Sequence, residues 1–239
     1  MMNKIDLHMH SYYSDDGEYA PTDLVQMCHK AGVELMAIAD HNSVKAIDEA
    51  QEEAQRLGLK YLSACEFDCT YKGINLHVLG YGFDHTQIVF EEIEENILRQ
   101  ELNNSSKKIE LTKQLGFDVT LDQLNSLSKN GVYTGEMFAE IILEDKRYLD
   151  HELLKPYRKG GSRDSNPFVN FYWDYYAQGK VCYTEMKFPS LEEIIEVIHL
   201  NGGVAILAHP GNNLKGQFEI IDEMFACGLD GVEAFSSYH

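Results

Sequence analysis

The stretch from Asp6 to Gly17, DLHMHSYYSDDG, decides how this sequence is interpreted. Residues 4–10 (KIDLHMH) have the pattern of a first β-strand, in which side chains two positions apart share one face. His8 and His10 therefore point to the same side of that strand. Two neighbouring imidazoles provide half of a metal site, but an isolated His-x-His pair is equally typical of ordinary surface or core histidines. The rest of the chain has to distinguish the two interpretations.

Several further predicted strands carry metal-binding residue types at or near their C-terminal ends. These residues are Asp40, His41, Glu66, His77 and His209. An α/β barrel builds its active site from the C-terminal ends of its strands, because those ends share one mouth. Each residue alone has an ordinary explanation, such as a helix cap or a satisfied core histidine. Their joint placement at equivalent strand ends predicts a metal-binding active site that includes His8 and His10.

The order of elements indicates an α/β fold with a parallel sheet, because strand and helix alternate through the first part of the chain. Strands are expected at 4–10, 34–40, 59–66, 74–81, 203–208 and 231–235. Residues 86–185 interrupt this alternation with a long charged helical segment, two shorter ones and a stretch rich in basic, glycine and aromatic residues. We therefore expect one domain formed by 1–85 and 186–239, with 86–185 as a helical insertion that caps the substrate.

Composition excludes some classes of protein. The 239 residues are 44% hydrophobic, which is enough for one sizeable core with an inserted subdomain. The net charge of −19 disfavours binding to duplex nucleic acid, and an anionic substrate would need local positive charge, for which divalent cations are suited. Scattered cysteines, no apolar run of about 20 residues and no secretion signal predict a cytoplasmic protein without a membrane partner. Nothing in the sequence indicates an oligomeric state.

Five motifs together resemble a known family. They are, in chain order, DLHMHSYYSDDG, IADHN, CEFD, NLHVLGYG and ILAHPG. This series is similar to the PHP (polymerase and histidinol phosphatase) family, and within it to the stand-alone phosphoesterases that include nucleoside 3′,5′-bisphosphate phosphatases. The similarity covers about residues 3–85 and 186–239. It implies a distorted TIM-like (β/α)7 barrel with two or three divalent metal ions, Zn, Mn or Fe, at its mouth.

The resemblance also implies which residues bind the metal ions. One ion would be bound by His8, His10 and Glu66. Glu66 would bridge to a second ion, which His77 and His209 also bind. A third ion would be bound by Asp15 and His41.

Other positions are less directly matched. The doubled aspartate in SDDG leaves Asp16 as a weaker candidate for the role given to Asp15. We expect Asp40 to serve catalysis together with Glu66, by orienting a neighbouring ligand. His239 lies where some relatives have a histidine near the cluster, so it is a candidate for binding metal or phosphate.

The end of the sequence departs from the family pattern. Relatives have an Asp-x-His motif on their last strand, and no such motif follows GVEAF here. With six predicted strands, we expect that a C-terminal piece of about 30 residues, with the seventh strand, is lacking from this chain. The alternative is a truncated barrel with an incomplete metal site.

The expected function is metal-dependent hydrolysis of a small phosphomonoester, such as a nucleotide or nucleoside bisphosphate, by a hydroxide that bridges the metal ions. Arg158, Lys159 and Arg163 are expected to bind the substrate phosphate, although a solvated loop with scattered charges explains them equally well. Three alternatives remain: a histidinol-phosphate phosphatase, an amidohydrolase-like hydrolase of C–N bonds and a non-catalytic metal-binding regulatory module. The pair of Asp15 and His41 argues against the amidohydrolase.

Overall fold

The computed structural model describes residues 4–128 and 131–235. The chain forms two compact units by internal contacts. We call Met1–Asn96 together with Phe188–His239 the sheet unit, and Ile97–Lys187 the helical unit. The helical unit begins eleven residues after the expected limit of 86 and ends two residues after the expected limit of 185, and its first boundary falls inside a long helix.

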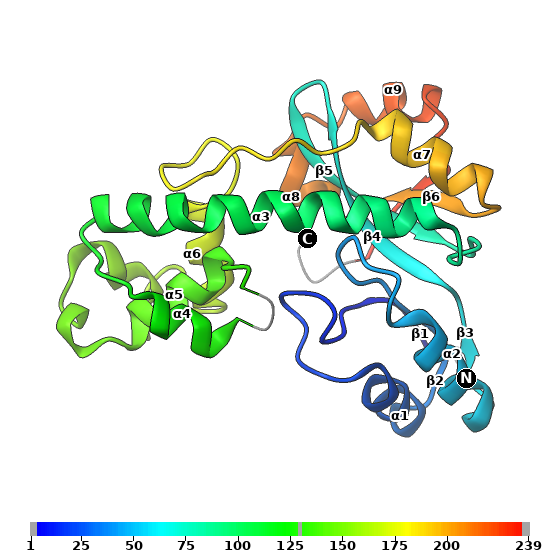
Figure 1. Ribbon diagram of the computed structural model, residues 1–239, viewed down its shortest axis with the longest axis horizontal. Helices are drawn as coiled ribbons and strands as arrows, with labels where there is room; N and C mark the ends of the chain where they lie inside the picture. Colours follow the sequence, from blue (N-terminus) through cyan, green and yellow to red (C-terminus); the bar gives the residue numbers. More distant parts are fainter. Residues whose placement is uncertain (1–3, 129–130, 236–239) are drawn as a thin grey trace. The chain divides into compact units, whose positions relative to one another are not determined.

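The first sheet of the sheet unit is parallel. Its strands are, in order, β1 (Lys4–Met9), β2 (Val33–Ile38) and β3 (Lys60–Tyr61). Helices α1 (Pro21–Ala31) and α2 (Ile47–Leu57) connect these strands and pack against each other (Figure 1). Both helices are followed by a glycine in the left-handed conformation, which satisfies the last helical carbonyls. The alternation of strand and helix expected from the sequence is confirmed in this part.

The second sheet is mixed. It has the order β4 (Ala64–Tyr71), β5 (Ile74–Tyr81), β6 (Val204–Leu207) and β7 (Gly231–Val232). The pairs β4–β5 and β5–β6 are antiparallel, and only β6–β7 is parallel, so the expectation of a parallel sheet is wrong here. For β4 and β5 the cause is the two-residue turn Lys72-Gly73, in which both residues have positive φ, because so short a connection can join only antiparallel strands.

The strand predicted at 59–66 is two strands, β3 and β4, and Glu66 therefore lies within a strand instead of at its end. An isolated parallel bridge between His41 and Glu66 links the first sheet to the second. No closed sheet is formed within the described ranges, so the mixed α/β class is confirmed and a TIM-like barrel is not.

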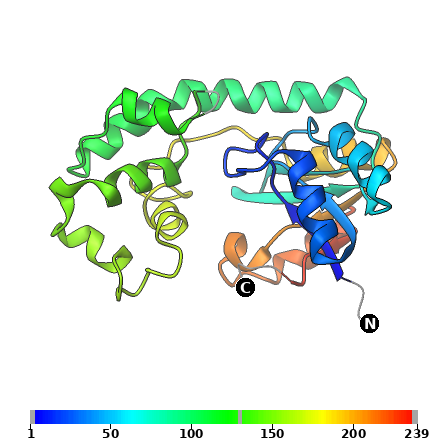
Figure 2. The same cartoon turned by 90° about the horizontal axis from the view of Figure 1, so that it is seen from below.

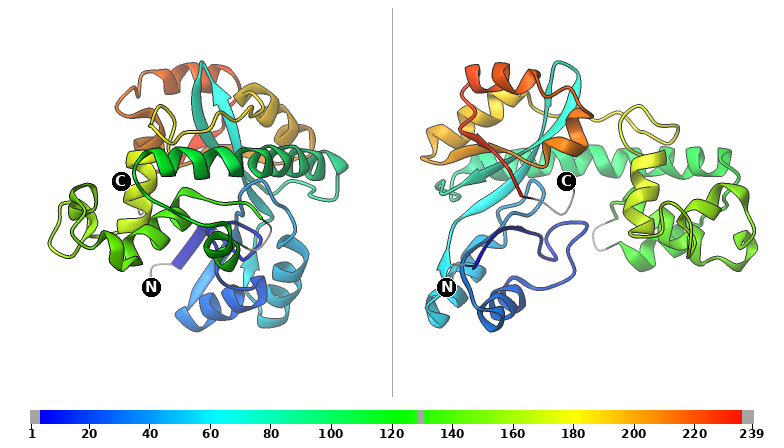
Figure 3. Two further views of the ribbon diagram at one scale, coloured as in Figure 1. Left: turned by 60° about the vertical axis from the view of Figure 1, so that its left-hand side comes forward. Right: turned by 180° about the vertical axis from the view of Figure 1, so that it is seen from behind.

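Helices cover both sheets. Figure 3 shows α1 and α2 beside the first sheet, and α7 (Leu191–Leu200) and α9 (Ile220–Ala226) beside the second. A short helix, α8 (Pro210–Leu214), follows β6. Phe67, Val78 and Ile198 are fully buried between β4, β5 and α7. Burial of such side chains contributes roughly 1.5–3 kcal/mol each and fixes the strands that carry the polar cluster described below.

The helical unit has a core of its own. Helix α3 (Ile88–Gln114) continues into it from the sheet unit (Figure 2). The other elements are α4 (Leu121–Leu127), α5 (Gly135–Glu144), η1 (Lys146–Tyr148), η2 (Glu152–Tyr157) and α6 (Pro167–Tyr175). Their apolar faces bury Phe117, Phe138 and Phe171 completely. Of the helices in the described ranges, none is both long and apolar enough to cross a membrane.

Candidate metal centre

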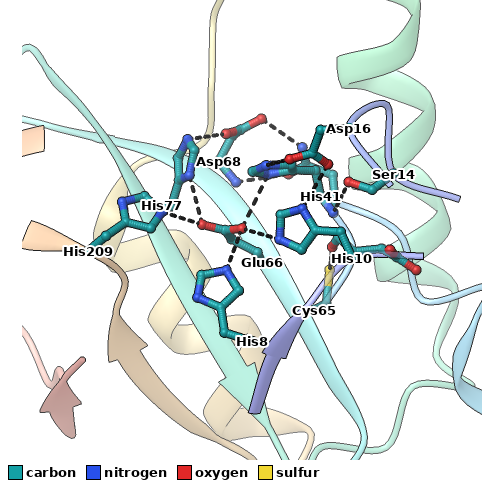
Figure 4. A network of polar contacts seen from close by, with 12 residues as sticks. His8, His10, Ser14, Asp16, His41, Cys65, Glu66, Asp68, His77 and His209 are labelled. Atoms are coloured by element: carbon teal, nitrogen blue, oxygen red, sulfur yellow. Dashed lines mark hydrogen bonds and ion pairs between the residues drawn. The ribbon is translucent and has the colours of Figure 1, made fainter. Parts of the chain in front are cut away.

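Glu66 lies at the middle of a cluster of imidazoles (Figure 4). Its side chain is 1% exposed, and its two carboxylate oxygens lie 2.8–3.6 Å from ring nitrogens of five histidines. The five are His8, His10, His41, His77 and His209. A buried carboxylate costs a large desolvation free energy unless charged or hydrogen-bonding groups surround it, and here they do.

Strand pairing explains this convergence. His8 lies on β1 and His10 just after it, while His41 follows the adjacent strand β2. The bridge from His41 to Glu66 then places β4 beside β2, and β5 with His77 pairs to β4. Residues far apart in the sequence therefore meet because successive strands lie next to each other.

His209 enters from the next strand along. It follows β6, which pairs with β5, and it has an unusual backbone with φ of 23° and ψ of 61°. This conformation is rare for a residue with a Cβ atom and stores strain, as is common at functional sites. It turns the chain from β6 into α8 and leaves the imidazole 2.8 Å from the Glu66 carboxylate.

The structure thus brings together six of the residues that the sequence singled out, but it changes the carboxylate expected in the first loop. Asp16, not Asp15, lies 2.7 Å from Nδ1 of His10 and 3.8 Å from Nε2 of His41. Asp15 is exposed and belongs to none of the candidate metal groups in the described residues. The motif match could not separate two adjacent aspartates, because only the turn decides which of them faces inward.

Asp40 stabilises the loop that carries Asp16 by accepting hydrogen bonds from Ser11. The Asp40 carboxylate is buried and accepts hydrogen bonds from the backbone N–H of Ser11 at 2.5 Å and from its hydroxyl at 2.6 Å. Ser11 in turn accepts from the N–H of Ser14 at 2.9 Å. Gly17 passes so close that a Cβ atom there would overlap the Ser11 carbonyl. Asp40 was expected to orient a ligand, and the contacts show it holding this loop.

Electrostatics in the cluster favour paired charges. Burial alone would raise the pKa of Glu66, but the surrounding imidazoles, His41 and His77 foremost, hold it well below its usual value. Burial alone would lower the pKa of His8, but hydrogen bonds to Glu233 and Glu66 outweigh it and raise the pKa to about 9. The pKa of His77 rises to about 10 against the same effect of burial, chiefly through the charge of Glu66. His41 differs: burial prevails and lowers its pKa.

Two carboxylates of the cluster were missed by sequence reasoning. Asp68 lies 3.0 Å from Nε2 of His77, and Glu233 lies 2.9 Å from Nδ1 of His8. Asp68 follows Glu66 by two positions on β4, so the period of two that pointed to His8 and His10 could have found it. Glu233 directly follows the two-residue strand β7, and no local signal distinguishes it from an exposed strand-end residue.

The remaining predicted site residues lie elsewhere. His239 is outside the described residues. Arg158, Lys159 and Arg163 belong to the helical unit. Arg163 makes a bidentate ion pair with Asp174, with both nitrogen–oxygen distances 2.9 Å. Arg158 donates a hydrogen bond to the carbonyl of Leu143. Lys159 is exposed.

The cluster fits divalent metal ions. It contains three groups of potential ligand atoms that lie within 4.8 Å of one another: His8, Glu66 and His209; His10, Asp16 and His41; and His41, Glu66 and His77. Imidazole nitrogens combined with carboxylate oxygens are the donors that Zn, Mn and Fe accept in proteins.

A family model described as the PHP domain matches residues 6–199, which is most of the chain. The chain belongs to the PHP domain family. Family, relatives and site together support the class of metal-dependent phosphoester hydrolases.

Curated relatives carry several phosphoester activities in their names. A 5′-3′ exoribonuclease of Haemophilus influenzae is 28% identical over 98% of this chain and 79% of its own length. A phosphoribosyl 1,2-cyclic phosphate 1,2-diphosphodiesterase of Eggerthella lenta is 24% identical over 98% of this chain and 83% of its own. A 3′,5′-nucleoside bisphosphate phosphatase of Chromobacterium violaceum is 26% identical over 100% of this chain and 79% of its own length.

Solved structures share the fold. A Chromobacterium violaceum protein named as an amidohydrolase has a TM-score of 0.80 at 23% identity, covering 99% of this chain and 78% of its own. A Bifidobacterium adolescentis protein, named provisionally as a metal-dependent phosphoesterase, has a TM-score of 0.75 at 24% identity, covering 98% and 77%. These similarities place the chain in the same fold.

Proposed function

We propose that this protein hydrolyses a terminal phosphomonoester of a small nucleotide, such as a nucleoside bisphosphate, with the help of two or three divalent cations. The observation that carries the proposal is the set of five imidazoles and two carboxylates, Glu66 and Asp16, within three overlapping ligand groups. The relative from Chromobacterium violaceum, named as a nucleoside bisphosphate phosphatase, supports the choice of substrate.

The side chains of the cluster have distinct parts in this reaction. His8 and His209 would hold one cation together with Glu66, His41 and His77 would hold a second with Glu66, and His10 with Asp16 and His41 would hold a third. Cations bound there lower the pKa of water and neutralise charge on a phosphoryl group. In the metal-free cluster the imidazoles hold the pKa of Glu66 well below its usual value, and bound cations would take over this role, so Glu66 would remain an ionised ligand in both states. Asp40 holds the Ser11–Gly17 loop and thereby the position of Asp16.

Phosphate binding is proposed for the basic residues of the helical unit. Arg163 already pairs with Asp174, and Arg158 is half-buried with one guanidinium nitrogen on the Leu143 carbonyl, whereas Lys159 is exposed. A lysine is a compact, mobile cation that can reach a phosphate without losing an existing ion pair. Among the three, Lys159 is therefore the residue whose replacement should raise KM while leaving the fold unchanged.

A second candidate function is 5′-3′ exoribonuclease activity. The specific observation in its favour is the Haemophilus influenzae relative, whose similarity extends over 98% of this chain. Both functions hydrolyse a phosphoester and would use the cations proposed above. They differ in the bond that is broken, a terminal phosphomonoester in one and an internucleotide phosphodiester in the other, and in the length of the substrate.

A substrate panel separates these candidates. Protein loaded with Mn²⁺ or Zn²⁺ is incubated with adenosine 3′,5′-bisphosphate, a short 5′-phosphorylated RNA, histidinol phosphate and an N-acyl amide, and phosphate, nucleotide and amine release are followed. We expect phosphate from the bisphosphate. Mononucleotides from the RNA would favour the exoribonuclease, and amine release would favour the C–N hydrolase. If metal-loaded protein cleaves no phosphoester, a non-catalytic metal-binding module is the better interpretation.

A further inference from the structure

Four histidines that face Glu66 also have a partner on their other ring nitrogen. The pairs are His8 Nδ1 with Glu233 at 2.9 Å, His10 Nδ1 with Asp16 at 2.7 Å, His77 Nε2 with Asp68 at 3.0 Å, and His209 Nδ1 with Asn213 at 2.8 Å. An ionised carboxylate can only accept, so a histidine nitrogen that faces one donates its N–H outward. Glu66 differs from these partners because it would itself bind the cations. Where a cation replaces the hydrogen bond between Glu66 and a ring, the ring would keep its N–H toward the outer partner and present its other nitrogen to the cation.

Glu233 serves two members of one ligand group. One of its carboxylate oxygens accepts from the His8 ring, and the other accepts the backbone N–H of His209 at 2.8 Å. His8, Glu66 and His209 form the first of the three groups. Glu233 therefore links the two histidines of this group, one through its ring and the other through the strained backbone from which its ring projects.

Asp68 has the same relation to a different group. One of its oxygens faces Nε2 of His77, and the other accepts from the side-chain amide of Asn42 at 2.7 Å. Asn42 also accepts the Asp68 backbone N–H at 2.9 Å and donates its own to the Glu66 carbonyl at 2.8 Å. Because Asn42 directly follows His41, this network joins both histidines of the group His41, Glu66 and His77.

We propose that Glu233 and Asp68 are positioning residues, each of which holds a separate half of the metal centre. Glu233 holds the half formed by His8 and His209, and Asp68, through Asn42, holds the half formed by His41 and His77. Glu66 is common to both halves. The inference deepens the proposed function, on which it rests for the presence of the metal ions. Loss of such an outer carboxylate costs about 10- to 100-fold in metal affinity or activity in other metalloproteins.

Glu233→Gln and Asp68→Asn test the proposal without removing any metal ligand. Zn²⁺ is titrated into metal-free protein against a chelating competitor, and the imidazole nitrogens are followed by NMR. We expect Glu233→Gln to weaken Zn²⁺ binding about 10- to 100-fold with the ring signals of His8 and His209 changed, and Asp68→Asn to do the same with those of His41 and His77. Because Glu233 and Asp68 contact different histidines, each variant should leave the other pair of signals as in the parent protein.

Asp230→Asn is the matched control. Asp230 pairs with Nε2 of His199 at 2.7 Å and accepts the backbone N–H of Ala205 at 2.7 Å, so it combines the same kinds of bond as Glu233 outside the metal groups. Equal losses of Zn²⁺ affinity in all three variants would mean that Glu233 and Asp68 act only through the general stability of the fold, which would overturn the proposal. Parent-like affinity and ring signals in Glu233→Gln and Asp68→Asn would also overturn it. Zn²⁺ binding without phosphoester cleavage by the parent protein would overturn the proposed function but leave the positioning roles intact.

Discussion

The sheet unit contains 26 Asp and Glu against seven Lys and Arg, whereas the helical unit contains 13 of each kind. The net charge of −19 therefore belongs to the unit that contains the histidine cluster, and the helical unit is neutral. Cations bound at Glu66 would offset part of this acidic excess at the place where an anionic substrate reacts. The two units therefore differ in charge balance: acidic side chains are in excess in the unit with the histidine cluster, which suits cation binding, whereas acidic and basic side chains are equal in number in the helical unit.

The residues of the two units also differ in what surrounds them. In the sheet unit, Glu66 is fully buried and its carboxylate faces the ring nitrogens of five histidines. In the helical unit, Arg163 forms an ion pair with Asp174 of the same unit. The Asp174 carboxylate also accepts a hydrogen bond from the hydroxyl of Tyr157 at 2.6 Å. The proposed function therefore places the chemistry in the sheet unit, where polar side chains are buried around one carboxylate. The following experiments test this contrast.

The largest effect is expected from Glu66→Gln. An amide cannot bridge cations as a carboxylate does, so we expect a loss of at least about 10³-fold in kcat/KM and loss of tightly bound metal. Phosphate release and metal content measured by elemental analysis provide the readouts. Glu94→Gln, which breaks only a pair with Lys45 in the same unit, should leave both unchanged. A Glu66→Gln protein that keeps its metal and activity would remove the central role of this residue.

A smaller effect should separate the two aspartates of the first loop. Asp16→Asn removes a carboxylate that contacts His10 and His41, and we expect about a 10- to 100-fold loss in kcat/KM. Asp15→Asn serves as the matched control one position away and should change kcat/KM by less than about twofold. Initial rates at saturating Mn²⁺ measure both. The reverse order of effects would restore Asp15 to the role that the motif alone implied.

The stability of the protein should depend on pH in opposite directions without and with bound metal. The pKa values of His8 and His77, about 9 and about 10, lie above the ordinary value of about 6.5. Their contribution to the stability of metal-free protein is therefore complete below about pH 6.5 and is lost as pH rises through 9 to 10. Metal binding needs neutral imidazoles, so stabilisation by metal is instead lost as pH falls.

Thermal unfolding at several pH values, with chelator and with Zn²⁺, measures this. We expect the unfolding temperature of chelated protein to fall on the order of 5 °C between neutral and strongly alkaline pH. Added Zn²⁺ should raise it most above about pH 7. The same pH trend with and without metal would show that the cluster does not bind the ion.

The smallest effects concern the separateness of the two units. Each contains a helix with a complete capping box, formed by Ser190 and Glu193 at α7 and by Thr120 and Gln123 at α4. Ser190→Ala and Thr120→Ala should each lower the free energy of unfolding of the unit that contains the helix by about 1 kcal/mol. If the units unfold separately, calorimetry should show each variant lowering a different transition. A common shift of a single transition in both variants would indicate that the units unfold together.

The sequence alone predicted which kinds of side chain form the candidate centre and six of the residues that the structure brings together there. Local patterns identified His8 and His10 by strand period, and His41, Glu66, His77 and His209 by their place in predicted strands. The order of motifs indicated the family. These features could be predicted because each depends on neighbouring residues or on residue type, both of which are visible in the sequence.

Only the tertiary structure decided the rest. The turn of the first loop selected Asp16 over Asp15, and a two-residue hairpin made β4 and β5 antiparallel. Glu233 reached His8 across 225 positions of sequence. A side chain's orientation and its distant contacts depend on how strands pair, and pairing is fixed by the packing of the whole unit instead of by any local stretch.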